Sequence, residues 1–486
     1  MSVEAILGAD KGTIVAPAGC GKTHLLCKAL EYCQAKPYLV LTHTTAGVYA
    51  LKKRLSFLGI PNKNFEVATI DGWAKKIADF FPVSCNITEN INNKKKYYPM
   101  LRDNVYKYIN TGNIFDIISA SYSRLLVDEY QDCNLSQHNL ICSLSNVLPT
   151  IVFGDPMQCI FNFNGDIANW SKDVIVKFPQ IVVLNKPWRW INAKNEELGE
   201  WVLSCRENLI NGSGINLKES PKSVQYYKFN SADSYKYREN LELQIKVQNN
   251  LIKTFKNESL LVIGSSTQPK KRFQYASSSY GIQVVETVDL DDIKTMISKL
   301  DNLSDNFSIA MQTINTLSET MCGVEKSKLD KRIPSLTKGT NRTEANAIEQ
   351  AVMSVINNGS RESIRDLIIT VEKDQKTRVY RSEALSIFKK SIDESIIKPN
   401  TTISRACEAV IEQRKHLGDN RIPPRAIGST LLLKGLECDH SLILNTTEML
   451  NNGNYKSGLN NLYVALSRAS KSISIFSDSE ILASTS

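Results

Sequence analysis

Residues 16–23 have the residue types and the spacing of a loop that binds phosphate groups. They follow an apolar, β-rich run and precede a helical pattern. Gly19 and Gly21 allow backbone N–H groups to turn inward around phosphate oxygens, and the N-terminus of the following helix adds partial positive charge. Lys22 is expected to contact the terminal phosphates, and Thr23 to ligate Mg²⁺. The segment therefore predicts a P-loop that uses a nucleotide and magnesium.

A second motif, Asp-Glu-Tyr-Gln-Asp at 128–132, ends a hydrophobic run that is typical of a buried strand. Asp128 at the strand tip is suited to hold Mg²⁺ through water, and Glu129 can accept a proton from an attacking water. Alone, this segment would be interpreted as an exposed acidic turn. The P-loop upstream favours the catalytic interpretation.

With these two motifs, the chain resembles superfamily 1 helicases of the UvrD/Rep branch. Further segments resemble the motifs of that family and occur in the same order. They are 41–47 with 51–54 (motif Ia), 69–73 (Ib), 154–165 (III), 185–189 (IV), 428–430 with 434–437 (V) and 462–469 (VI). The resemblance implies an ATP-dependent DNA helicase or translocase that moves 3′ to 5′ on single-stranded or tailed DNA.

The resemblance also implies roles for individual residues. Gln158 and Arg189 would lie at the γ-phosphate, and Arg468 would supply an arginine finger from the second lobe. Planar guanidinium groups can spread charge over the transferring phosphoryl oxygens. Catalytic roles are thus expected for Glu129, Gln158, Arg189 and Arg468, and metal contacts for Thr23 and Asp128. Nucleotide contacts are expected for Ala18, Gly19, Cys20, Gly21, Lys22, Thr23, Trp188 and Glu437, the last at the ribose.

Two departures from the family pattern concern the nucleotide. The family has a glutamine upstream of the P-loop that reads adenine, and residues 1–15 contain none. Trp188 replaces the tyrosine of the family, so we expect adenine to be held by stacking. Leu431 occupies the position of a histidine in motif V, which removes one polar link between the ATP and DNA sites.

Single-stranded DNA is usually held by aromatic platforms together with backbone contacts. The resemblance places such contacts at Thr42, His43, Thr44, Trp73, Phe161 and Phe163. A Phe pair at i and i+2 is, on its own, more often part of a half-buried strand. The basic runs 94–96 and 270–272 are interpreted first as solvated faces and second as DNA contacts.

The elements that must position these residues follow an alternating β/α pattern, which predicts an α/β fold with parallel sheets. Strands are predicted at 12–16, 38–42, 67–69, 124–128, 150–153, 181–184, 259–264, 427–432 and 472–476. Helices are predicted around 345–356, 364–371, 384–392 and 403–411. We therefore expect one RecA-like lobe at 1–85 and 122–180 with a short insertion at 86–121, and a second at 181–300 and 421–486 with a helical insertion at 301–420.

The composition indicates which broad classes of protein are compatible with this chain. The 486 residues carry a net charge of +9, which allows a polyanionic partner without requiring one. The 11 cysteines are scattered and form no CxxC pair, so neither a zinc site nor a disulfide framework is indicated. No apolar run reaches the roughly 20 residues that span a bilayer. We expect a cytoplasmic protein.

Two further functions remain as alternatives. The first is a DNA-stimulated ATPase that regulates a separate nuclease subunit, because compact chains of this kind resemble the helicase partners of nucleases in phage-defence systems such as Gabija. The second, a P-loop kinase or small GTPase, is disfavoured because a late arginine motif is not needed there. Strand separation without a partner discriminates the motor from the regulatory subunit.

Overall fold

The computed structural model describes residues 3–33, 35–160, 166–229, 236–287, 289–340, 342–417, 422–451 and 455–483, without the side chains of 415–417 and 455. Packing divides the chain into two compact units. The first unit consists of Met1–Tyr226, Met449–Ile473 and Ser479–Ser486, and the second of Tyr227–Glu448 and Ser474–Asp478.

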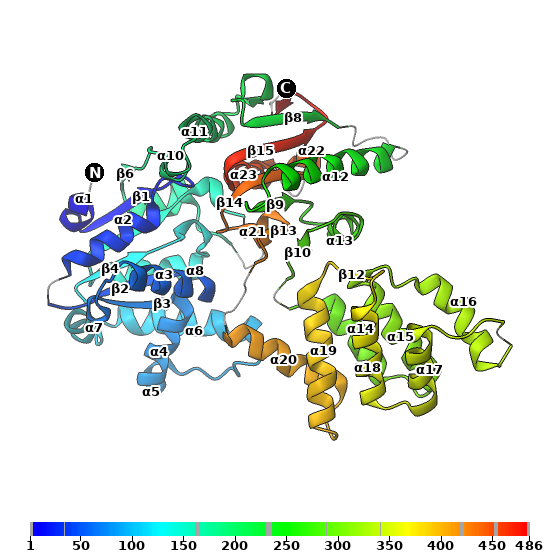
Figure 1. The fold of residues 1–486 in the computed structure, drawn as a ribbon. Coiled ribbons are helices and arrows are strands. Elements are labelled where there is room, and N and C mark those ends of the chain that lie inside the picture. Colours follow the sequence, from blue (N-terminus) through cyan, green and yellow to red (C-terminus); the bar gives the residue numbers. More distant parts are fainter. Residues whose placement is uncertain are drawn as a thin grey trace. The chain divides into compact units, whose positions relative to one another are not determined.

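The first unit contains a six-stranded sheet in the order β3-β2-β4-β5-β1-β6, and its paired strands are parallel (Figure 1). Strands β2, β4 and β5 are buried along their whole length, as expected for a parallel sheet covered on both faces. Because the strands are parallel, the segments that follow β1 and β4 lie at the same edge of the sheet. The strands are β1 (Lys11–Val15), β2 (Tyr38–Thr42), β3 (Phe65–Thr69), β4 (Arg124–Val127), β5 (Thr150–Gly154) and β6 (Gln180–Val183).

Helices pack against this sheet in two apolar clusters. One cluster includes Trp73 and Leu101, and the other includes Leu26 and Leu55. The predicted insertion at 86–121 is helical, and it contributes Leu101 and its neighbours to the first cluster. The helices are α1 (Val3–Gly8), α2 (Lys22–Ala29), α3 (Thr45–Phe57), α4 (Ile70–Phe80), α5 (Pro82–Cys85), α6 (Lys94–Asn110), α7 (Phe115–Ser121), α8 (Leu135–Leu144), α9 (Ile175–Lys177), α10 (Trp188–Asn192), α11 (Glu196–Asn211) and α23 (Tyr455–Leu466).

The second sheet has six strands in the order β10-β13-β9-β14-β15-β8. Strand β9 pairs in parallel with β13 and β14, and β10 pairs in parallel with β13. The strands are β8 (Val224–Lys228), β9 (Leu260–Ile263), β10 (Gln283–Val284), β13 (Arg425–Gly428), β14 (Cys438–Ile443) and β15 (Ala469–Ser477). Its helices are α12 (Tyr237–Thr254), α13 (Pro269–Ser278), α21 (Thr430–Leu433) and α22 (Thr446–Leu450). Two short antiparallel pairs, β7 (Ile215–Asn216) with β16 (Ile481–Leu482) and β11 (Met321–Cys322) with β12 (Arg378–Val379), complete the strands.

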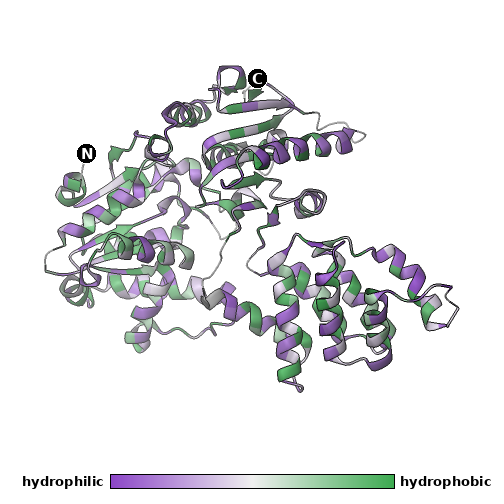
Figure 2. Ribbon diagram, viewed as in Figure 1, coloured by the Kyte–Doolittle hydropathy of each residue, from purple (hydrophilic) through white to green (hydrophobic). Residues whose placement is uncertain are grey.

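The second unit also contains a helical insertion with its own apolar core. Figure 2 shows hydrophilic and hydrophobic residues alternating along its helices, as expected for helices that bury one face. Arg381, which is completely buried, joins the insertion to the loop after β10 through two hydrogen bonds to the Glu286 carboxylate, at 2.7 and 2.9 Å. The helices are α14 (Asp291–Asp301), α15 (Asn306–Ser318), α16 (Lys326–Thr337), α17 (Ala347–Asn358), α18 (Arg361–Lys373), α19 (Ser382–Ile397) and α20 (Ile403–Leu417).

The architecture confirms the predicted α/β class, with two sheets of the kind expected for RecA-like lobes and a helical insertion in each. One strand prediction needs correction, because 427–432 is a strand only as far as Gly428. The Ser429 hydroxyl accepts from the Leu432 N–H and caps helix α21, so the chain turns helical there. Within the described ranges, no helix is both long and apolar enough to cross a membrane.

The packing of the chain also differs from the predicted lobe boundaries. Strand β6, placed at the start of the second lobe, pairs with β1 in the first sheet. Residues 449–473, which include most of α23, pack with the first unit rather than the second. The insertion begins at α14, ahead of the expected residue 301.

Candidate nucleotide site

The loop between β1 and α2 has the backbone that a phosphate-binding turn requires. Gly19 and Gly21 have φ of 72° and 88°, a region that side chains other than glycine rarely adopt. Gly21 is the N-cap of α2, so the first free N–H groups of that helix lie in the loop. Lys22 and Thr23 form the first turn of α2, so the helix begins one residue before the predicted start at Thr23.

Helix α10 packs against the outside of this loop. A Cβ on Gly19 would lie 2.6 Å from the Trp190 ring, and one on Gly21 would lie 3.1 Å from Trp188. The Arg189 N–H donates to the Gly19 carbonyl at 3.1 Å. Trp188 remains 45% exposed, and an ammonium group, that of Lys186, lies 4.0 Å from the centroid of its ring. Glycine is therefore needed here for close packing as well as for φ.

A three-residue charge cluster lies at the carboxyl edge of the first sheet. The Lys22 ammonium is 2.9 Å from Asp128 Oδ1 and also donates to Glu129 Oε1. Burial lowers the pKa of Lys22, but the two carboxylates raise it further, and the result is a pKa above the ordinary lysine value. Lys22 thus remains a cation across the physiological range. Burial raises the pKa of Asp128 above the usual aspartate value.

The position of Glu129 is set by the backbone and by Gln131. Glu129 has φ of 55°, an unusual value for a residue with a side chain, and it lies directly after the Asp128 strand tip. The Gln131 amide donates to Glu129 Oε2 at 2.5 Å, and its Oε1 accepts from the Asp155 N–H at 3.1 Å. Gln131 therefore ties the acidic motif to the turn after β5.

A buried ion pair holds that turn, and one of its members, Arg206, is not predicted from the sequence. The Arg206 guanidinium on α11 donates twice to Asp155 Oδ1, at 2.8 and 3.1 Å, and both side chains are at least 95% buried. The Gln158 amide donates to Asp155 Oδ2 at 3.1 Å. Burial lowers the pKa of Arg206, but the Asp155 carboxylate raises it above the ordinary value. No local motif marks Arg206 in the sequence, because its partner lies on another element.

The segment 462–469 approaches the P-loop within the first unit. The Tyr463 hydroxyl accepts from the Ala18 N–H at 2.9 Å, and the Trp190 indole N–H donates to the Ala469 carbonyl at 2.8 Å. The Arg189 guanidinium donates to the Ser467 carbonyl. Burial raises the pKa of Tyr463 well above the ordinary value, so it is neutral here. The sequence alone assigns no role to Tyr463.

Arg468, the predicted arginine finger, is turned back onto its own segment. Its Nε donates to the Val464 carbonyl and its Nη2 to Ser467 Oγ, each at 2.8 Å, and the residue is 2% exposed. It belongs to the first unit, as does the P-loop. To reach a phosphate, its side chain would have to exchange these contacts.

The remaining predicted residues lie in varied surroundings. Thr42 is buried at the end of β2, His43 is half-buried, and the Thr44 hydroxyl caps α3 by accepting from the Gly47 N–H. Trp73 is fully buried in the apolar core, so stacking on a base would require the ring to leave that core. Phe161 and Phe163 lie outside the described residues, and Glu437 is an exposed residue of the second unit.

Cys20 gives a test of the loop's environment. Burial, together with the Asp155 charge, raises the pKa of its thiol to about 12, so the reactive thiolate is scarce at neutral pH. We expect Cys20 to resist iodoacetamide at pH 8 in the folded chain and to react once the chain is unfolded in urea, as measured by peptide mass mapping. Modification of Cys20 as fast as that of a free thiol would contradict the buried position.

The donors around the loop fit a nucleotide with a magnesium ion. The loop offers glycine backbone and a lysine cation for phosphate oxygens, and the Thr23 hydroxyl and Asp128 carboxylate are hard oxygen ligands of the type Mg²⁺ takes. Among the residues that the structure describes, no group of three or more His, Cys, Asp or Glu side chains could hold a metal. A metal in this site would therefore depend on phosphate and water ligands as well.

Comparison with known proteins gives one family match. Residues 96–173 match the model of the UvrD/REP helicase N-terminal domain. No curated protein matches the chain. Among solved structures, an arterivirus helicase, nonstructural protein 10 in complex with DNA, is similar over 53% of this chain and 49% of its own, at 12% identity and a TM-score of 0.26. The Pif1 helicase of Candida albicans is similar over 51% of this chain and 53% of its own, at 14% identity and a TM-score of 0.27.

The chain thus spans about half the length of each of these structures, and TM-scores this low do not establish a shared fold. The family match covers α6 to α8, β4 and β5, the part of the first unit that contains the acidic motif and the Asp155 turn. Over residues 96–173, this chain is similar to the N-terminal domain of the UvrD/REP helicases.

Proposed function

We propose that this chain is an ATP-dependent DNA motor that couples ATP hydrolysis to 3′–5′ movement on single-stranded DNA. The observation that carries the proposal is the cluster of Lys22, Asp128 and Glu129 beside a glycine turn. In this arrangement a bound nucleotide can take over both ion pairs. The phosphate would replace the carboxylates as the partner of the lysine, and Mg²⁺ would replace the lysine as the partner of the carboxylates, so that every charge stays neutralised. The UvrD/REP match over the acidic motif supports the same conclusion.

Each residue of the cluster has a distinct task in this proposal. Lys22 would leave its carboxylate partners for the β- and γ-phosphates, while Thr23 and Asp128 would hold Mg²⁺. When bound, the ion would neutralise developing charge on the phosphate oxygens. Glu129, released from Lys22, would accept the proton of the attacking water, and the contact with Gln131 keeps its carboxylate oriented.

The second group of tasks belongs to side chains on the neighbouring turns. Gln158 would orient the attacking water, held by its bond to Asp155. Arg189 and Arg468 would supply positive charge at the transferring phosphoryl group. Both now donate to groups of the segment 464–467, so a rearrangement of that segment would accompany catalysis. Such a rearrangement is a means of coupling hydrolysis to movement.

The test of this proposal is ATP turnover by the purified chain with and without single-stranded DNA. We expect strong stimulation by DNA, and we expect Glu129→Gln to lose turnover by a factor of roughly 10² to 10⁴, the usual contribution of a general base. ATP binding should persist, because the substitution leaves the Lys22 cation and the glycine turn that would contact the phosphates unchanged. Turnover of Glu129→Gln equal to that of the parent would remove Glu129 from the mechanism.

The alternative, a regulatory subunit of a nuclease, predicts a different result for the same purified chain. Leu431, which replaces the family histidine, is half-buried on the short helix α21 and offers no polar group. If this missing link weakens coupling, DNA-stimulated turnover will be present while a tailed duplex stays intact. Separation of the duplex by the chain alone would favour the motor.

A further inference from the structure

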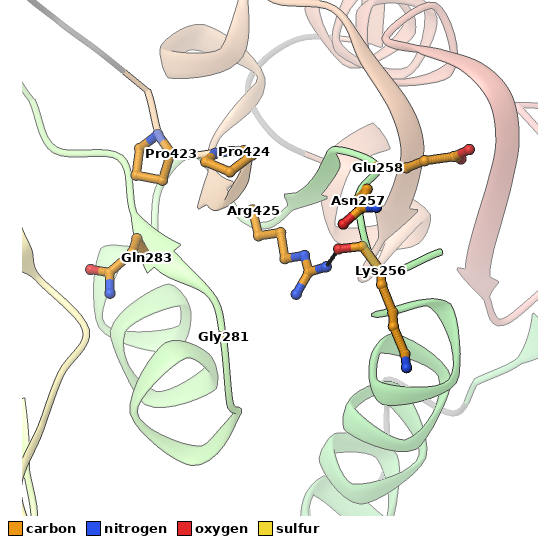
Figure 3. Close-up of a pocket in the computed structure, with 8 residues that line it drawn as sticks. All are labelled: Lys256, Asn257, Glu258, Gly281, Gln283, Pro423, Pro424 and Arg425. Atoms are coloured by element: carbon orange, nitrogen blue, oxygen red, sulfur yellow. Dashed lines mark hydrogen bonds between the residues drawn. The ribbon is translucent and has the colours of Figure 1, made fainter. Parts of the chain in front are cut away.

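Two cavities among the described residues of the second unit differ in character. The larger encloses about 380 Å³ near the amino ends of β9 and β13. There the Arg425 guanidinium donates to the Lys256 carbonyl (Figure 3). Lys256 is exposed and Arg425 partly so, which means that water can solvate both charges. Nothing about this open hollow requires a ligand.

The smaller cavity encloses about 110 Å³ and lies between α12 and α13, at the carboxyl ends of β9 and β14. This is the edge of a parallel sheet at which α/β folds bind ligands. The volume is several times the roughly 10–15 Å³ that one water molecule needs. Its lining includes Arg272, Tyr275 and Glu448.

Arg272 is a buried cation that forms no salt bridge with a carboxylate in the described part of the chain. It is 4% exposed, and the methylene groups of its side chain pack directly against Gly264. The guanidinium donates to the Ser265 carbonyl, and its Nε has no hydrogen-bond partner among the described residues. Burying such a charge without an anion costs several kcal/mol.

Other buried arginines in the chain show how this cost is usually offset. Arg206 pairs with Asp155, and Arg381 pairs with Glu286 and Asp292. The pKa of each is raised by its carboxylates in spite of burial. Burial instead lowers the pKa of Arg272, with only a weaker opposing effect of Glu286. The sequence places Arg272 in a basic run that suggested a solvated face, and the structure buries it.

Two more polar atoms in the lining have no hydrogen-bond partner within the ranges that the structure describes. The Tyr275 hydroxyl is buried in a side chain that is 1% exposed, and Glu448 Oε1 is buried as well. The other Glu448 oxygen lies 3.3 Å from the Lys271 ammonium, which offsets its charge. The cavity thus presents a guanidinium N–H and a hydroxyl that can donate, and one carboxylate oxygen that can only accept.

We propose that this cavity binds a phosphate group that retains a proton. Two of its oxygens would accept from Arg272 Nε and the Tyr275 hydroxyl, and its P–OH would donate to Glu448 Oε1. Arginine is well suited to phosphate oxygens. Sulfate and the phosphodiesters of a DNA backbone have no proton at neutral pH, so the Glu448 carboxylate would repel them. The ligand is therefore inorganic phosphate or a terminal phosphomonoester that binds as its monoanion, since the second pKa of a phosphomonoester is about 6.

The test uses the full-length chain carrying Lys22→Ala, which weakens anion capture at the P-loop. Inorganic phosphate should raise its melting temperature, because a ligand that binds only the folded chain stabilises it, and sulfate at equal ionic strength should not. Arg272→Met, which keeps the packing stem, should abolish the increase. Lys270→Met, the same charge change on an exposed neighbour, should leave it intact.

Two milder variants keep the proposal testable if Arg272→Met does not fold. Tyr275→Phe should weaken phosphate affinity by roughly tenfold or more, the value of a hydrogen bond to a charged group. Glu448→Gln should allow sulfate to bind as phosphate does. Three outcomes would overturn the proposal: no increase with phosphate or an equal increase with sulfate in the Lys22→Ala chain, a phosphate-induced increase that Tyr275→Phe leaves unchanged, or continued exclusion of sulfate by Glu448→Gln.

The source of the phosphate is decided with oligonucleotides in the same background. A larger melting shift for a 5′-phosphorylated strand than for its 5′-hydroxyl form, lost in Tyr275→Phe, assigns the cavity to a phosphomonoester end. A shift with inorganic phosphate and none between the two strands assigns it to the free ion.

Discussion

Replacing Lys22 with alanine is expected to lower ATP turnover by at least about 10²-fold, the effect of removing one preorganised charge from a transferring phosphoryl group. The structure gives a second reason for a large effect. Lys22 is the cation that both Asp128 and Glu129 contact. Without it, two neighbouring carboxylates would face an incoming nucleotide that is itself an anion, so binding should weaken together with turnover. Steady-state ATPase kinetics and a nucleotide titration measure the two effects.

Lys28→Ala is the matched control, because Lys28 is an exposed lysine on the same helix. It should leave turnover within about twofold, as expected for a surface change away from the site. Circular dichroism should show both variants folded, since Lys22 packs against charges rather than in the apolar core. Retention of turnover by folded Lys22→Ala would refute the assignment of residues 16–23 as the nucleotide loop.

Replacing Arg206 with methionine is expected to cost about 3–5 kcal/mol in the free energy of unfolding, the usual result of leaving one member of a buried ion pair without its partner. Asp155 is 1% exposed and would keep an uncompensated charge. Turnover should fall as well, because Asp155 also orients Gln158. Urea denaturation and the DNA-stimulated kcat measure these effects, with KM for ATP expected to change less than kcat.

A double-variant cycle separates the ion pair from general disruption. Arg206→Met with Asp155→Asn removes both charges, so the double variant should be more stable than the sum of the single losses implies. Arg238→Met is the control, because Arg238 forms an exposed i,i+4 pair with Glu242 that should contribute about 1 kcal/mol or less. Strict additivity of the two losses would mean that Arg206 and Asp155 do not act together.

The strands were predictable where the chain is apolar. The predicted 38–42 coincides with β2, and the predictions at 124–128 and 150–153 fall within one residue of β4 and β5. Strand β14 was missed because it contains Asp439 and His440, whose polar groups bond to Ser259 and Glu258. The local pattern of polar and apolar residues cannot reveal hydrogen-bond partners that come from a distant part of the chain.

The residues of the candidate site also differ in how far the local sequence could predict them. Lys22 and Glu129 could be predicted as members of one site because each lies in a short motif, and the structure brings their side chains into contact. Arg206 and Tyr463 could not, since their roles depend on Asp155 and Ala18, which lie far away in the sequence. For Trp73, the motif predicts a DNA contact, and the amphipathic helix α4 places the ring in the apolar core.

The hydrogen bond between Ala18 and Tyr463 joins residues 445 positions apart. During synthesis, β1 and α2 therefore leave the ribosome long before Tyr463, Ser467 and Ala469 exist. The P-loop and α10 contact this segment through three hydrogen bonds, which end at Tyr463, Ser467 and Ala469. A nascent chain cannot form all three until residue 469 has been translated. Contacts of such long sequence separation form late in folding. The order of translation itself thus keeps the nucleotide loop incomplete in any chain that has not reached residue 469.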